Sequence, residues 1–177
     1  SLPTYIEIVQ IDTISANLGL GFLQDALVAG LIALIGVASV IIIRYRQLRF
    51  VVPMIVISFS EVLIILGMSI LIGSTIDLAA IAGIIAVIGT GVNSQIIMID
   101  QALRKEVQQD TLQEKLKRAF FIIFGSGGTV IAAMLPLLFL GFGVLRGFAI
   151  TTIIGVLAGI LIARPAFGTI IERVIKE

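Results

Sequence analysis

The sequence is dominated by five long runs of apolar residues, each long enough for a helix to cross a bilayer. Such a helix rises ~1.5 Å per residue and must cover ~30 Å of hydrocarbon, which takes about 20 residues. With 59% hydrophobic and 13% charged residues, the chain has more apolar surface than a soluble core of this size can bury. The sequence therefore predicts an all-α membrane protein with five transmembrane helices. The expected spans cover residues 22–43, 51–72, 79–100, 119–140 and 147–163.

The first residues differ from the rest of the chain. Residues 4–11, TYIEIVQI, alternate in the manner of a β-strand, and residues 12–21 have the composition of a connector. A lone strand has no partner, so we interpret 1–21 as the end of an extracytoplasmic domain. Residues 22–177 are then the transmembrane domain, in which Arg164-Pro165 is expected to close the last span before a cytoplasmic tail, 164–177.

The distribution of basic residues predicts the orientation. Eleven of the twelve Lys and Arg residues lie in 44–49, 104–118 and 164–177, which the positive-inside rule places in the cytoplasm. We therefore expect a multi-pass protein of the plasma membrane, with the N-terminus of this chain outside and its C-terminus inside. The charged loop 101–118 has a periodicity that suits a short amphipathic helix at the membrane surface.

The third span is predicted to be the central packing element. At helical spacing, one face of this helix has small residues at one end and polar residues at the other. Small residues let helices approach closely in lipid, and polar residues need partners away from lipid. This face consists of Ala82, Ala86, Gly89, Asn93, Ile97 and Asp100.

Three polar residues are candidates for an ion relay inside the membrane. Glu61 lies well inside the second span, where a carboxylate costs roughly 2.5–3.5 kcal/mol, so it faces helices or water or is protonated. A protonated glutamic acid that pins two helices is an equal alternative. Asn93 is more often a residue that joins helices by hydrogen bonds, and Asp100, near the interface, is more often a surface carboxylate.

Glycines in the last two spans predict further close helix contacts. Gly125 and Gly128 lie in the run GSGGT, and Gly155 and Gly159 have a GxxxG spacing. The chain has neither cysteine nor histidine, and its polar residues form no nucleophile–base pair, metal cluster or nucleotide loop. We therefore expect no catalytic residue, metal or cofactor, and hence no enzyme.

Longer stretches resemble a known family along essentially the whole chain, in order. They include IVQIDTISANLGLGFLQDALVAGLIAL, then RYR followed by VVPMIVISFSEVLIILG, and DLAAIAGIIAVIGTGVNSQIIMIDQ. RAFFIIFGSGGTVIAAMLPLLFLG and LRGFAITTIIGVLAGILIARPAF follow. The chain resembles the SecD branch, of archaeal type, in the SecD/SecF family of the resistance–nodulation–division superfamily.

The resemblance implies half of a helical bundle whose other half is a SecF-like subunit, together assisting the Sec translocon in moving unfolded preproteins across the bilayer. It also implies that the first span and most of the outer domain are missing from this chain, and no nucleic acid is expected as a partner. In bacteria the family uses the proton gradient. Members commonly have an aspartate where this chain has Asn93, so a proton-carrying role does not transfer to that position.

Two other functions remain open at this stage. One is a small-molecule efflux permease of the same superfamily, which would need a second set of spans. The other is a purely structural partner of the translocon, whose carboxylates would matter for assembly alone.

Overall fold

The computed structural model describes residues 16–74, 76–104, 111–140 and 144–176, and every element in these ranges is helical. Five helical stretches are long and apolar enough to cross a membrane, which confirms the predicted fold class. The expected strand at residues 4–11 lies outside the described residues. The helices are α1 (Ala16–Tyr45), α2 (Leu48–Leu71), α3 (Leu78–Leu103), α4 (Leu112–Leu140), α5 (Val144–Ala158), the π-helical turn η1 (Gly159–Ala163) and α6 (Arg164–Lys176).

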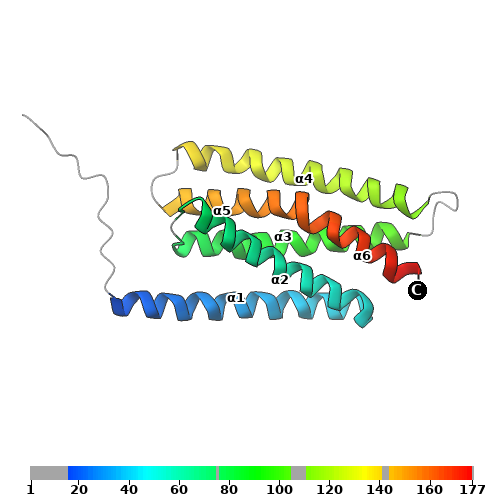
Figure 1. Ribbon diagram of the computed structural model, residues 1–177, viewed down its shortest axis with the longest axis horizontal. Coiled ribbons are helices and arrows are strands. Elements are labelled where there is room, and N and C mark those ends of the chain that lie inside the picture. The colour runs from blue at the N-terminus through cyan, green and yellow to red at the C-terminus, as the bar shows by residue number, and fades with distance from the viewer. Residues whose placement is uncertain (1–15, 75, 105–110, 141–143, 177) are drawn as a thin grey trace, which may run out of the picture.

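Helix α3 lies at the centre of the bundle (Figure 1). It packs most extensively against α5, and it also contacts α1, α2, α4 and α6. The buried residues of α3 are mainly two of its three glycines and larger apolar side chains: Gly83, Gly91, Ile84, Val87, Ile88, Val92, Met98 and Ile99. Its central place agrees with the prediction, but the face that it buries is not the predicted one.

Local signals explain where several helices begin and end. Asp77 caps α3, because its side chain accepts a 2.7 Å hydrogen bond from the backbone N–H of Ala80. Thr111 and Glu114 form a reciprocal capping box at the start of α4, in which Glu114 Oε2 accepts from the Thr111 N–H at 2.8 Å. Gly73, with a φ of 71°, turns the chain after α2, where a residue without a Cβ is favoured.

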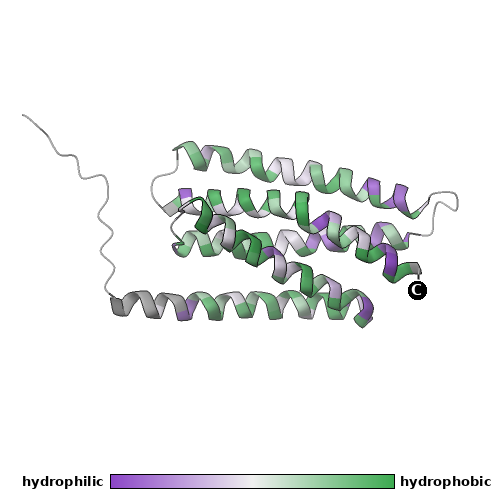
Figure 2. Cartoon of the chain, viewed as in Figure 1, coloured by the Kyte–Doolittle hydropathy of each residue, from purple (hydrophilic) through white to green (hydrophobic). Residues whose placement is uncertain are grey.

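Hydrophobic residues predominate along the helices (Figure 2), and many large apolar side chains are exposed, as a membrane protein requires. Hydrophilic residues gather at the end where α1 stops and α4 starts. Helices α1 and α4 lie at the edges of the bundle. Only 6% of the most apolar 18-residue stretch of α1 is buried, and only 11% of that of α4. Most of their surface therefore remains available to lipid or to other helices.

The structure corrects two expectations about helix ends. The helix does not stop at Arg164-Pro165, because α5, η1 and α6 continue without a break to Lys176, and the apolar stretch runs over Leu145–Ile175. The prediction of a separate surface helix within 101–118 is also wrong for the residues that the structure describes. Residues 112–118 are the first turns of α4 itself.

Candidate functional site

A buried ion pair joins α2 to the start of α6. Arg164 donates to Glu61 twice, from Nη1 to Oε2 and from Nη2 to Oε1, both at 3.1 Å. The Arg164 and Glu61 side chains are only 4% and 2% exposed. Glu61 is about 20 Å along α2 from its start and about 15 Å from its end, so the pair lies near the middle of that span. The two charges compensate each other in a place where a single charge would be costly.

Two glycines make room for this pair. A Cβ on Gly91 would lie 2.8 Å from Glu61 Oε2 and 3.2 Å from Arg164 Nη2. A Cβ on Gly159 would lie 2.5 Å from Glu61 Oε1 and 3.1 Å from Arg164 Nη2. Because α3 and η1 have no side chain at these positions, the pair fits between their backbones.

The π-helical turn explains how Arg164 reaches Glu61. The backbone N–H of Arg164 bonds to the carbonyl of Gly159, five residues earlier rather than four. Pro165 follows at once, and in a regular α-helix its ring would clash with the carbonyl four residues before it. The wider turn accommodates the proline and lets the helix continue with Arg164 facing the interior.

A second buried polar contact lies between α2 and α3. Gln95 is fully buried, and its Nε2 donates to Ser58 Oγ at 3.3 Å. Ser58 lies one turn before Glu61 on α2, and Gln95 lies one turn after Gly91 on α3. The polar interior is therefore a short line of side chains on neighbouring turns and not an isolated pair.

The ion pair also forms one wall of a hollow of about 220 Å³ between α3 and α4, which is lined by both polar and apolar side chains. Asn93 lines the hollow and is exposed in this chain, so Glu61 and Asn93 share one site. Serine and threonine hydroxyls supply much of the remaining polar lining: Thr90, Ser94, Ser126 and Thr129. Each of these four hydroxyls donates to a carbonyl of its own helix, so its oxygen can accept a hydrogen bond from a group in the hollow.

Asp100 is not part of this site. It lies at the end of α3, where Oδ2 is 3.0 Å from Arg44 Nη2 and Oδ1 is 3.0 Å from the Tyr45 hydroxyl. The Tyr45 hydroxyl is also 3.2 Å from the carbonyl of Ile96. Arg44 and Asp100 are both substantially exposed, so this group fastens the end of α1 to α3 at the surface of the bundle.

The glycines proposed from sequence fall into two groups. Gly155 and Gly159 lie in close contacts, with a Cβ on Gly155 2.6 Å from the Val87 side chain. Gly89, Gly125 and Gly128 have no neighbouring atom within 4 Å of such a Cβ, so they make no close helix contact within this chain. Their faces of α3 and α4 are exposed.

Sequence reasoning missed Arg164, Gln95 and Gly91. The Arg-Pro pair resembles the end of a span, so the sequence predicts a tail from Arg164 onwards. A usable signal does follow it: Phe167, Ile171 and Val174 recur at helical spacing, which indicates a helix that continues with one apolar face. Phe167 and Ile171 are indeed fully buried.

Comparison with known proteins gives a consistent result. The family model described as protein export membrane protein SecD/SecF, C-terminal, matches residues 2–165. The chain is 50% identical, over its whole length, to the protein-export membrane protein SecD of Methanocaldococcus jannaschii, covering 44% of that protein. The SecD of Methanothermobacter thermautotrophicus is 46% identical over 97% of the chain, again with 44% of the relative covered.

A bacterial relative is more distant. The protein translocase subunit SecD of Leptotrichia buccalis is 34% identical over 91% of the chain and is covered to 40%. No solved structure matches the chain significantly. The chain thus spans less than half the length of these curated relatives.

Proposed function

Because the chain belongs to the SecD/SecF family of protein-export membrane proteins, we propose that it is the transmembrane part of a SecD subunit that assists the Sec translocon in preprotein export. It is a multi-pass membrane protein by its five apolar helices. In this proposal it has no enzymatic role. Movements of its helices, made together with a SecF-like subunit, act on the outer domains that handle the unfolded substrate.

The observation that carries the partner proposal is the exposed polar face of α3 and α4. A membrane helix hides its amides and hydroxyls from lipid, yet Asn93, Ser126 and Thr129 are exposed in this chain. The same face has exposed small residues, Ala86 and Gly89, that allow close approach of another helix. These features support a second set of helices that covers the hollow between α3 and α4.

The Glu61–Arg164 pair has a fixed structural role in this proposal. Both carboxylate oxygens are held by one guanidinium, and two glycine backbones close around the pair. A bidentate arginine–carboxylate contact is strong and geometrically specific. We therefore do not assign ion relay to Glu61, and Asp100 is engaged by Arg44 and Tyr45. A titrating group for any ion coupling then comes from the partner, opposite Asn93.

A matched pair of glycine variants tests the proposal in the full-length protein. Gly89→Leu would place a large side chain on the proposed partner face, and Gly36→Leu would place one on the outer side of α1. Both glycines have nothing within 4 Å of an added Cβ. We expect Gly89→Leu to abolish co-purification of the SecF-like subunit and to reduce export severalfold, whereas Gly36→Leu keeps both. Equal behaviour of the two variants would refute the partner face.

Comparing co-purification with export in such variants also distinguishes a purely structural partner of the translocon from a subunit with an active role. A purely structural partner of the translocon would lose export only to the extent that assembly is lost. A variant on this face that assembles normally but exports poorly supports the active role. The efflux alternative is not favoured by the relatives, which are named for protein export or protein translocation.

A further inference from the structure

Two buried polar atoms near the ion pair have no hydrogen-bond partner among the described residues. One is a donor, Arg164 Nε, and the other is an acceptor, Gln95 Oε1. Gln95 is fully buried, and the Arg164 side chain is only 4% exposed. Buried polar atoms in proteins are nearly always hydrogen-bonded, either to protein groups or to ordered water. A single group that both accepts and donates would satisfy this donor and this acceptor together.

The direction of the helices brings the two atoms towards each other. Helices α3 and α6 run in the same direction (Figure 1), and Gln95 lies one turn after Gly91 on α3. The Arg164 side chain runs back along its own helix, because Nη2 lies 3.1 Å from the position of a Cβ on Gly159 and 3.2 Å from that of a Cβ on Gly91. Its Nε is nearer the α6 backbone than Nη2 is, so it lies on the side of the ion pair that faces Gln95.

A water molecule has the size and the chemistry to join these atoms. Arg164 Nε and Gln95 Oε1 do not bond to each other directly. One water can accept from the first and donate to the second, with about 2.9 Å between the heavy atoms of each bond. Buried waters typically make about three hydrogen bonds, and Ser58 can supply another. The Ser58 oxygen accepts from Gln95 Nε2 at 3.3 Å, which leaves the hydroxyl proton to donate to the water.

The other buried atoms without partners in the described part of the chain lie farther away. They are the hydroxyl oxygens of Ser69 and Thr152. Ser69 lies about 12 Å along α2 from Glu61, and Thr152 lies about 18 Å along α5 and η1 from Arg164. The donor on Arg164 and the acceptor on Gln95 are therefore matched to each other and not to these hydroxyls.

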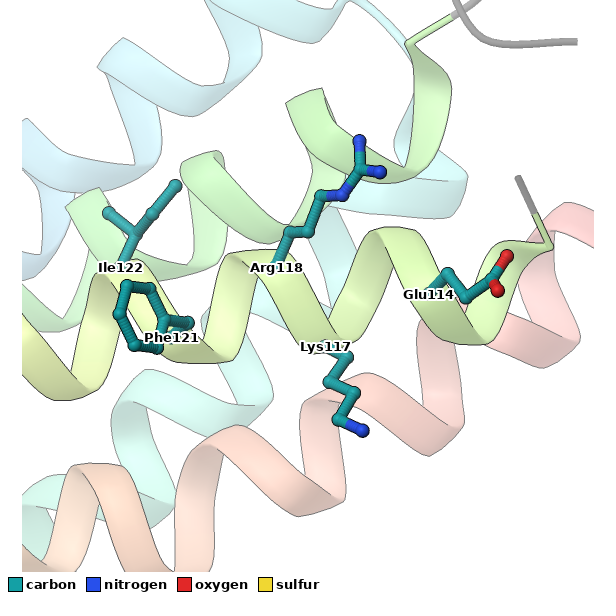
Figure 3. A pocket seen from close by; sticks show the side chains of 5 residues that line it. All are labelled: Glu114, Lys117, Arg118, Phe121 and Ile122. Carbon is teal, nitrogen blue, oxygen red and sulfur yellow. The ribbon is translucent and has the colours of Figure 1, made fainter. Parts of the chain in front are cut away.

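The exposed hollow at the start of α4 has no such matched groups (Figure 3). Lys117 and Arg118 line it but extend to different sides of the helix, and Arg118 has an interaction of its own. Glu114 is also engaged, because its Oε2 accepts from the Thr111 N–H at 2.8 Å. The charges of this hollow thus do not converge on one ligand, unlike the donor and the acceptor beside the ion pair.

We propose that one buried water molecule bridges Arg164 Nε and Gln95 Oε1. The hollow between α3 and α4, which Arg164 lines, gives the water a route of entry. The water joins the Gln95–Ser58 contact to the Glu61–Arg164 pair, so α2, α3 and α6 share one hydrogen-bond network. All three guanidinium nitrogens are then held, which makes Gln95 a positioning residue for Arg164. The site lies inside this chain and does not depend on the export proposal.

Solid-state NMR of the full-length protein in bilayers, with nitrogen-15 in its arginines, tests for this water. The Arg164 Nε signal is assigned by its contact with a glutamate carboxylate and by its absence from Arg164→Lys. We expect magnetisation to pass from water to Arg164 Nε as fast as to exposed arginines, although this side chain is buried. Gln95→Leu should reduce the transfer severalfold, whereas Gln101→Leu, the same change near the end of α3, should not. No transfer in wild type, or equal transfer in Gln95→Leu, would overturn the proposal.

A double-mutant cycle gives a second readout. Arg164→Lys keeps a positive charge for Glu61 but has no Nε–H group. Gln95→Leu should therefore lower the denaturant midpoint clearly in the wild-type background and much less in the Arg164→Lys background. Equal shifts in the two backgrounds would show that Gln95 and Arg164 are not linked, against the proposal. A through-bond NMR coupling between Arg164 Nε and the Gln95 side-chain carbonyl would also overturn it, because the two groups would then bond without a water.

Discussion

The Glu61–Arg164 pair makes a definite prediction at the scale of single residues. Removing one partner leaves an uncompensated charge in the middle of the bundle, which costs about 3–5 kcal/mol. We expect Glu61→Gln and Arg164→Gln each to lower the unfolding free energy of the purified full-length subunit by that order. The double variant Glu61→Gln/Arg164→Gln should recover much of the loss, because no charge is then left unpaired. Denaturant unfolding in detergent measures all four proteins of the cycle.

Export measured on the same four proteins separates a structural pair from an ion carrier. A structural pair predicts that the double variant regains export together with stability. Recovery of stability without recovery of export would instead assign Glu61 a direct role in coupling, against our proposal.

The glycine cradle gives a second prediction at this scale. Gly91→Ala would bring a methyl group within 2.8 Å of Glu61 Oε2, and overpacking of this kind costs typically 1–3 kcal/mol. Gly89→Ala, two residues earlier on α3, meets nothing within 4 Å and should leave stability equal or slightly raised, since alanine favours helix. Thermal unfolding of the subunit purified without its partner compares the two. A similar cost for both would mean that the pair does not need the space beside Gly91.

At the scale of elements, the π-helical turn η1 is predicted to accommodate Pro165. Deleting Ile162, which is about half exposed, leaves Arg164 four residues after Gly159, so the turn can close as a regular α-helix that keeps Arg164 facing Glu61. The ring of Pro165 then meets the carbonyl four residues before it, which should lower the free energy of unfolding by about 3 kcal/mol. Pro165→Ala should restore stability in the deletion background, and Ile162→Ala, which removes the same side chain without shortening the helix, should be close to neutral. Denaturant unfolding compares these proteins; a deletion variant that Pro165→Ala does not rescue would show that η1 sets the direction of Arg164 instead.

The same elements show what the sequence could and could not predict. Length and apolarity were enough for the five helices, because a bilayer demands about 20 apolar residues from each. The end of the last helix was not predicted, because Pro165 usually ends or kinks a helix. Here the wider turn η1 accommodates the proline, and nothing in the sequence signals that turn as clearly as the proline signals a break. The buried face of α3 was also missed. In lipid both faces of a helix are apolar, so periodicity alone does not tell which face meets a helix of the same chain.

At the scale of the whole molecule, burial in the bundle is one-sided. Glu61, Gln95 and Arg164 are enclosed by this chain, while Asn93 and Thr129 remain exposed around the hollow between α3 and α4. The bundle pairs its buried charges within this chain but leaves the neighbouring polar face of α3 and α4 exposed. We expect this pattern of half of a larger assembly. The exposed face and the ion pair are neighbours, so a partner that enters the hollow comes close to the pair.

A photo-crosslinking experiment on the assembled complex tests this arrangement without relying on export. A photoreactive amino acid placed at Ala86 or Thr129, on the faces of α3 and α4 that we assign to the partner, should form an adduct with the SecF-like subunit. The same probe at Leu31 on α1 or Leu63 on α2, which are 59% and 55% exposed, should react with lipid and give no such adduct. Because all four positions are open in this chain, differences in yield report the neighbour and not local exposure. Adducts with the partner from Leu31 or Leu63, and none from Ala86 or Thr129, would move the interface to the opposite side of the bundle.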